Sequence, residues 1–151
     1  MVAYLGLGHL IKRKNMVQRD YILREIEKIG ALINAFRQKI FGGSGNLAIT
    51  LENQIENSKG MLLNEMNFDL DKFLTLNSEE LNEYISGFDG FNVENIELLA
   101  DCLSQIGFDD NCDRSKMYLE KSLQLYELCN LKSKSYSFER EAKITKIKIS
   151  L

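Results

Sequence analysis

Two neighbouring stretches, residues 96–107 and 115–126, constrain the fold of this chain more than any other feature. In each, apolar residues recur at steps of three and four, which places them on one face of an α-helix. The turn between them, residues 108–114, lets the two helices fold back on each other. The chain also contains no proline in its 151 residues, and proline is the residue that most often breaks a helix. We therefore expect an all-α fold of six or seven helices, arranged as antiparallel helical hairpins.

The same helical spacing predicts the other elements. The clearest is residues 20–41, whose apolar stripe consists of Ile22, Ile26, Ile29, Ile33, Phe36 and Ile40. A second helix is expected over 46–66, with Gly60 as a point where it bends or ends. Ser78 is the expected N-cap of the next helix. The apolar residues after 146 alternate as in a strand, but the spacing before them favours a helix from residue 137 to the end.

The length of the chain suits one domain. Gly42-Gly43-Ser44-Gly45 is the one break in composition that could form a linker. We expect a single helical domain over 16–151, with an N-terminal helical arm at 16–41 and a helical-repeat-like body at 46–151. Residues 1–15 place their apolar part before their basic part, the reverse of a secretory signal. They are interpreted either as native or as a flexible extension upstream of Met16. No stretch reaches the length of a transmembrane segment.

Charge is segregated along the chain. Residues 1–41 carry eight Lys and Arg against three Asp and Glu, residues 42–113 carry two against fifteen, and residues 114–151 carry nine against four. This pattern can be satisfied inside one molecule, between copies of the protein, or by a charged partner. Ion pairs within one molecule are the simplest of these interpretations.

The helix pair at 96–126 resembles a tetratricopeptide repeat. That motif pairs a large residue with a small one on its first helix, has a glycine near the end of this helix and interleaves small and large residues on the second. The matching residues are Leu99, Ala100, Leu103 and Gly107 on the first helix and Leu119, Ser122 and Leu123 on the second. The resemblance implies a short tetratricopeptide-like stack, an architecture whose surface usually binds proteins or peptides.

A repeat of this kind implies a concave face lined by residues of the first helix that packing does not require. These are Glu97, Asp101, Ser104 and Gln105. The face would be acidic and polar, so a basic peptide would suit it, and ordinary solvated helix surface is the alternative. The chain carries its own candidate occupant in its C-terminal segment, which holds Arg140, Lys143, Lys146 and Lys148.

The N-terminal helix suggests two further expectations. Residues 20–27 resemble the opening of a family of uncharacterised bacterial proteins with no assigned activity, which implies a bacterial origin. The wide apolar stripe could also pair the protein with a second copy, as a homodimer. The residues of this oligomer stripe are Ile22, Ile26, Ile29, Ile33 and Phe36.

No pattern predicts a catalytic, cofactor-binding or metal-binding residue. Asp109, Asn111, Asp113 and Glu120 have the spacing of a calcium loop, but Arg114 stands where that loop needs glycine. An acidic turn in which Asp113 caps the next helix explains these residues better. His9 is the only histidine, so a histidine-based nucleophile or metal site is not expected.

We therefore expect a non-enzymatic interaction or scaffold protein of unknown protein or peptide partner. Its three cysteines show no C-x-x-C spacing and suggest reduced thiols in the cytoplasm. The alternative is a protein that binds nucleic acid or an anionic membrane surface through its basic N- and C-terminal segments. An isoelectric point near 5.3 is not the strongly basic value of a typical nucleic-acid-binding protein, so nucleic acid is not an expected partner. An enzyme of unknown type is a distant third.

Overall fold

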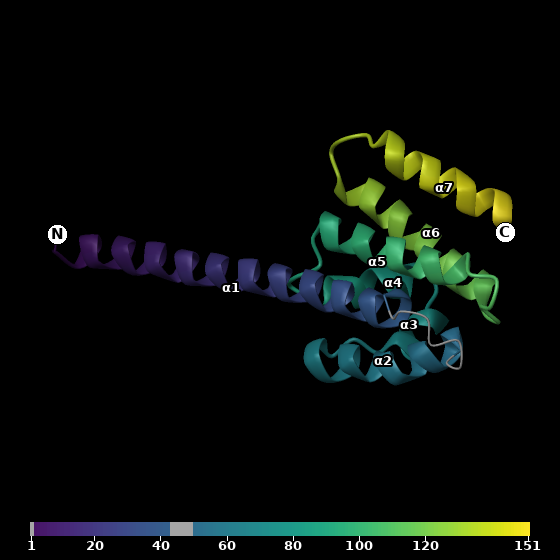
Figure 1. Ribbon diagram of the computed structural model, residues 1–151. Coiled ribbons are helices and arrows are strands. Elements are labelled where there is room, and N and C mark those ends of the chain that lie inside the picture. Colours follow the sequence, from purple (N-terminus) through teal and green to yellow (C-terminus); the bar gives the residue numbers. More distant parts are fainter. Residues whose placement is uncertain (1, 43–49) are drawn as a thin grey trace.

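The computed structural model describes the backbone of residues 2–42 and 50–151 and the side chains of 17–42 and 50–151. Seven helices make up this part of the chain: α1 (Val2–Phe41), α2 (Leu51–Met66), α3 (Leu70–Thr75), α4 (Ser78–Ser86), α5 (Val93–Gly107), α6 (Ser115–Lys132) and α7 (Phe138–Ser150). The described residues contain no strand, which confirms the prediction of an all-α fold with six or seven helices. Helices α2 to α7 form a body, along which α1 runs and beyond which it extends (Figure 1).

Polar N-caps set the helix boundaries. Thr50, Asp69, Asn77, Asn92 and Ser137 each accept a hydrogen bond from a backbone N–H three residues later. The cap of α4 is therefore Asn77, in a capping box with Glu80, and the prediction of Ser78 was wrong by one residue. Asp113 was also predicted wrongly, since the N-cap of α6 is Arg114, which makes no side-chain capping bond.

Helix α2 is shorter than predicted at its start and continuous at its centre. It begins at Leu51 instead of residue 46, and Gly60 lies inside it without ending it. It stops at Asn67, whose φ of 57° is left-handed and whose N–H bonds the carbonyls of Leu62 and Leu63. Asparagine tolerates this conformation better than other residues with a side chain.

The α5–α6 hairpin is the centre of the body. Leu99, Ala100 and Leu119 are buried where the two helices meet. The Ser122 hydroxyl donates a hydrogen bond to the Ala100 carbonyl at 2.7 Å. A Cβ atom on Gly107 would lie 2.7 Å from Leu119 Cγ, so the helices approach too closely here for a side chain.

Helix α1 is fixed to the body along its C-terminal half. Gly90 lies against the backbone of Glu25, which leaves no room for a side chain. Asn95 Nδ2 donates to the carbonyls of both Ile26 and Gly90, each at 2.8 Å. The C-terminal half of the predicted arm thus packs against the body of the same chain. The side chains of 1–15, and residues 43–45 of the expected linker at 42–45, lie outside the described residues.

Candidate functional site

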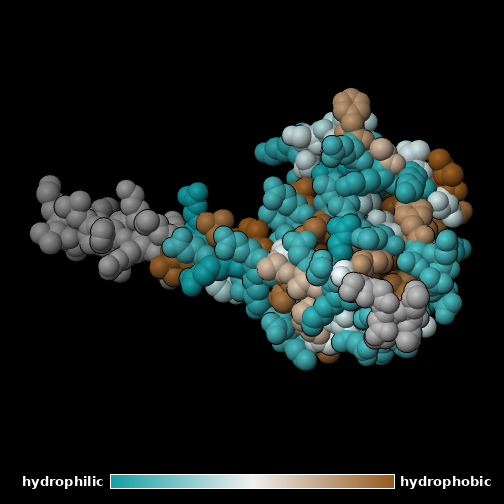
Figure 2. Space-filling view, viewed as in Figure 1, coloured by the Kyte–Doolittle hydropathy of each residue, from teal (hydrophilic) through white to brown (hydrophobic). Residues whose placement is uncertain are grey.

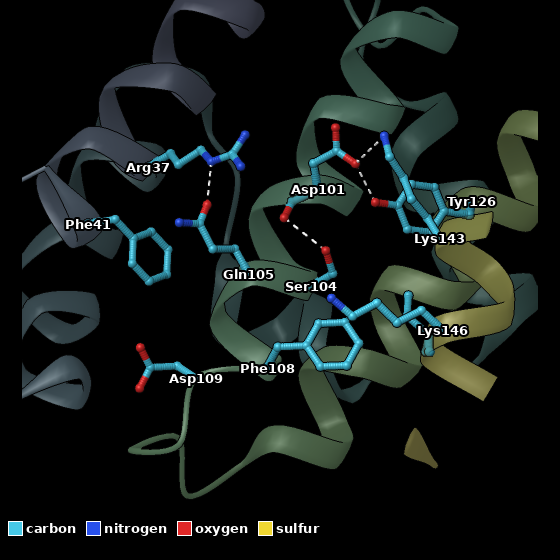
Figure 3. A pocket seen from close by; sticks show the side chains of 11 residues that line it. Arg37, Phe41, Asp101, Ser104, Gln105, Phe108, Asp109, Tyr126, Lys143 and Lys146 are labelled. Carbon is cyan, nitrogen blue, oxygen red and sulfur yellow. Dashed lines mark hydrogen bonds and ion pairs between the residues drawn. The ribbon is translucent and has the colours of Figure 1, made fainter. Parts of the chain in front are cut away.

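A hollow of about 570 Å³ opens between the C-terminal end of α1, α5 and α7 (Figure 3). We call it the α1–α5–α7 hollow. The side chains that line it are Arg37, Phe41, Asp101, Ser104, Gln105, Phe108, Asp109, Tyr126, Lys143, Lys146 and Ile147. It therefore includes three of the four residues predicted to bind a partner, together with residues of α1 and α7 that come from distant parts of the sequence.

Helix α7 covers the acidic side of α5. Arg140 Nε lies 2.9 Å from Glu97 Oε1, and Lys143 Nζ lies 3.0 Å from Asp101 Oδ1. The Tyr126 hydroxyl donates to the same Asp101 oxygen. Burial, followed by this bond, raises the pKa of Tyr126 above its ordinary value. Cations of α7 thus pair with both carboxylates, so the C-terminal segment of the chain itself occupies this part of the predicted face.

The two polar residues of the predicted face also bind within the chain. Arg37 Nε donates to Gln105 Oε1 at 2.6 Å, although 68 residues separate them. The Ser104 hydroxyl donates to the Asp101 carbonyl at 3.0 Å. Glu97, Asp101 and Gln105 therefore take part in the contacts of α5 with α7 and α1, whereas the Ser104 bond lies within α5.

The balance of charge left in the hollow is positive. Lys146 Nζ lies over the Phe108 ring, 4.6 Å from its centroid, and bonds no carboxylate among the described residues. Within the same part of the chain, Arg37 uses only Nε and leaves its two terminal nitrogens for other partners. Phe41 lines the same hollow (Figure 3). Cationic groups beside aromatic rings suit an anionic ligand that carries apolar groups.

Sequence reasoning missed the contributions of Arg37, Phe108 and Lys146 to this site. The sequence did not single out Arg37 or Phe108, and Lys146 was named only among the basic residues of the C-terminal segment. Their convergence depends on how α1 and α7 dock onto α5. No spacing within one helix carries that information.

The predicted oligomer stripe divides into a buried part and an exposed part. Ile29, Ile33 and Phe36 are at most 2% exposed in the core of their own chain, so they cannot contact a second copy. Ile26 is half-buried, whereas Ile22 is 40% exposed. Apolar groups lie on the surface of α1 where it leaves the body (Figure 2). The exposed members of this region are Val17, Tyr21, Ile22 and Leu23.

A second hollow, of about 650 Å³, lies between α1, the end of α2 and the end of α4. Its lining includes four acidic side chains and one lysine: Glu25, Glu65, Glu83, Asp89 and Lys28. The negative charge of the middle of the sequence gave a general signal for such a surface, but it did not identify these positions.

The described residues also bear on metal and thiol chemistry. They hold no group of three or more His, Cys, Asp and Glu side chains that could bind a metal ion. Glu120 lies within α6, so it cannot complete a calcium-binding loop that begins at Asp109. Burial raises the pKa of the Cys102 and Cys129 thiols to about 12, which leaves them protonated at neutral pH.

Comparison of the chain with protein-family models, with curated proteins and with solved structures gives no match. None of the helices in the described part of the chain has the length and apolar character needed to span a bilayer. The function is therefore inferred from the geometry of the chain's own residues.

Proposed function

We propose that this protein is a non-enzymatic interaction protein and that its α1–α5–α7 hollow binds an acidic segment of a partner protein. The observation that carries the proposal is that Arg37 and Lys146 line one open hollow together with Phe41 and Phe108. The resemblance of α5 and α6 to a tetratricopeptide repeat supports it, because such helical stacks present extended binding surfaces.

The chemistry of the hollow defines the ligand. A Glu or Asp side chain of the partner would accept hydrogen bonds from the terminal nitrogens of Arg37, a group suited to carboxylates. A second carboxylate would face Lys146. Exposed ion pairs contribute only roughly 0.2–1 kcal/mol each. An apolar side chain that packs on Phe41 and Phe108 is therefore needed for useful affinity.

Labelled peptides test the proposal directly. We expect a peptide with Glu or Asp around a Phe or Leu to bind, and its Gln and Asn counterpart to bind at least about tenfold more weakly. Binding is followed by fluorescence anisotropy as salt is raised, which should weaken it. Arg37→Glu and Lys146→Glu should each abolish most of the binding.

Matched controls lie on the same two helices. Lys39 in the last turn of α1 and Lys148 near the end of α7 are exposed and outside the lining. Lys39→Glu and Lys148→Glu should leave affinity unchanged. Equal losses in all four variants, or equal binding of a basic peptide, would contradict a site in this hollow.

We also propose that the exposed end of the α1 stripe pairs with a second copy. Arg19, Ile22, Leu23 and Ile26 follow the spacing of one helix face. Glu25 and Glu27 flank that face. In an antiparallel pair of α1 helices, Arg19 of one copy would lie near Glu25 and Glu27 of the other. These opposite charges at facing positions favour the interpretation that the surface pairs with a second copy over the interpretation that it is an exposed apolar surface without a partner.

A further inference from the structure

The connection between α6 and α7 carries an unusual set of exposed side chains. Leu131 is 78% exposed, Tyr136 69% and Phe138 82%. The rings of Tyr136 and Phe138 pack against each other edge to face, with centroids 4.8 Å apart and an interplanar angle of 88°. Single exposed apolar residues are ordinary, but three within eight residues form a local surface. The connection lies at an outer edge of the molecule (Figure 1).

Positive charge accompanies these apolar groups. Lys132 and Lys134 are exposed and form no ion pair within the part of the chain that the structure describes. From residue 128 to residue 138 the sequence contains no Asp or Glu. We call Leu131, Lys132, Lys134, Tyr136 and Phe138 the α6–α7 tip.

We propose that the α6–α7 tip binds an anionic lipid surface. The Phe138, Tyr136 and Leu131 side chains would enter the boundary between headgroups and acyl chains, where aromatic rings are favoured. Lys132 and Lys134 would remain at the level of the anionic headgroups. This inference concerns a different surface from the α1–α5–α7 hollow and does not depend on it.

The fold holds the tip in place for such an encounter. Arg140, two residues after Phe138, is buried and bonded to both Glu97 and Asn130. The Ser137 side chain caps α7 directly before Phe138. Because these contacts already order the base of the tip, binding would lose less conformational entropy than an unstructured segment would.

A lipid surface fits the tip better than a nucleic acid does. A nucleic-acid strand would extend past the tip onto neighbouring surface, where Glu127 and Glu139 are exposed. A membrane contacts a protruding tip alone, and an aliphatic residue such as Leu131 gains more from acyl chains than from bases.

Co-sedimentation of the full chain with vesicles tests the proposal. We expect binding to vesicles of phosphatidylcholine with phosphatidylserine, little binding to phosphatidylcholine alone, and loss of binding as salt is raised. Lys132→Gln and Lys134→Gln should each weaken binding about fivefold. Phe138→Ser should weaken it about tenfold or more. No binding to the anionic vesicles would overturn the proposal.

Exposed residues elsewhere provide the controls. Leu63 on α2 and Lys116 at the opposite end of α6 are exposed. Leu63→Ser and Lys116→Gln should bind vesicles as the unaltered protein does. If they lose binding as much as the tip variants, the tip is not the contact. Stronger binding of single-stranded RNA than of anionic vesicles, lost in the same tip variants, would also overturn the proposal.

A fluorescent variant tests insertion itself. The chain has no tryptophan, so Phe138→Trp introduces a single indole at the tip. Its emission should shift to the blue on anionic vesicles and be quenched by brominated acyl chains. Emission that stays at the wavelength of a water-exposed indole while the protein sediments with the vesicles would contradict insertion of the tip. Because residue 138 is exposed, this change should not disturb the fold.

Discussion

Arg140 of α7 donates a hydrogen bond from Nε to Glu97 Oε1 of α5 at 2.9 Å, across 43 residues of sequence. Its Nη1 atom donates to Asn130 Oδ1 of α6 at 3.1 Å. The Arg140 side chain is only 6% exposed, while that of Glu97 is 27% exposed. One guanidinium thus fastens α7 to both helices of the central hairpin and removes the charge that would otherwise attract a basic ligand to α5.

Arg140→Ala should therefore loosen α7. The substitution leaves the partly buried Glu97 carboxylate without its partner, and loss of one member of a buried pair costs about 3 kcal/mol or more. We expect the free energy of unfolding in urea to fall by about 3 kcal/mol, with faster amide hydrogen exchange in α7 than in α5. Lys148→Ala, an exposed change on the same helix, should alter stability by less than about 0.5 kcal/mol.

Two buried tyrosines should differ in how the stability of the fold responds to loss of their hydroxyl groups. Tyr126 donates to Asp101, so Tyr126→Phe should lower the free energy of unfolding by about 1.5–3 kcal/mol. The Tyr118 hydroxyl is buried and has no hydrogen-bond partner among the described residues. Tyr118→Phe should therefore leave stability unchanged or raise it by about 1 kcal/mol. A loss on Tyr118→Phe equal to that on Tyr126→Phe, measured in urea, would show that a partner of Tyr118 exists.

Alkaline pH should destabilise the fold. The pKa of the Cys102 and Cys129 thiols is about 12 in the folded protein against an ordinary value of 9.0. Between these values the unfolded chain loses protons that the folded chain retains. Each thiol's contribution to the free energy of unfolding is thus complete below pH 9 and declines by about 1.4 kcal/mol per pH unit up to about pH 12.

Urea unfolding at several pH values in this range measures the effect. Burial also raises the pKa of Tyr118, so this tyrosine adds to the loss of stability at high pH. Burial lowers the pKa of Lys121, so this lysine opposes the loss. Cys102→Ala should lower stability at every pH because it leaves a cavity. It should also reduce the slope of the free energy of unfolding against pH by the equivalent of about one proton. An unchanged slope would mean that this thiol does not contribute to the pH dependence.

Most of the helices could be predicted because each buries a stripe that repeats with the helical period, although α1 begins at Val2 and not at residue 20. Their ends were less predictable. Asn77 and Ser78 are both good N-caps, and only the backbone bonds of α4 select Asn77. In α6 the sequence offered Asp113 as a cap, but the N-cap is Arg114, which makes no side-chain capping bond.

The candidate site was less predictable than the fold because it depends on contacts between distant segments. Gln105 was recognised as a residue on the polar side of α5, but its bond to Arg37 joins residues 68 positions apart. The same limit applies to α1. Ile22 and Ile33 have equivalent places in one periodic stripe, and only the position of α5 and α2 decides which of them is covered.

That division of the α1 stripe can be tested with two substitutions of the same residue type. Ile33 is 1% exposed in the core, so Ile33→Ala should lower the free energy of unfolding by about 2–5 kcal/mol. Ile22 is 40% exposed, so Ile22→Ala should change the stability of the monomer by less than about 0.5 kcal/mol. If a second copy covers this surface, Ile22→Asp should instead shift the monomer–dimer equilibrium toward monomer in sedimentation equilibrium. A chain that is monomeric before the substitution would contradict self-association through α1 but would leave the predicted difference in stability intact.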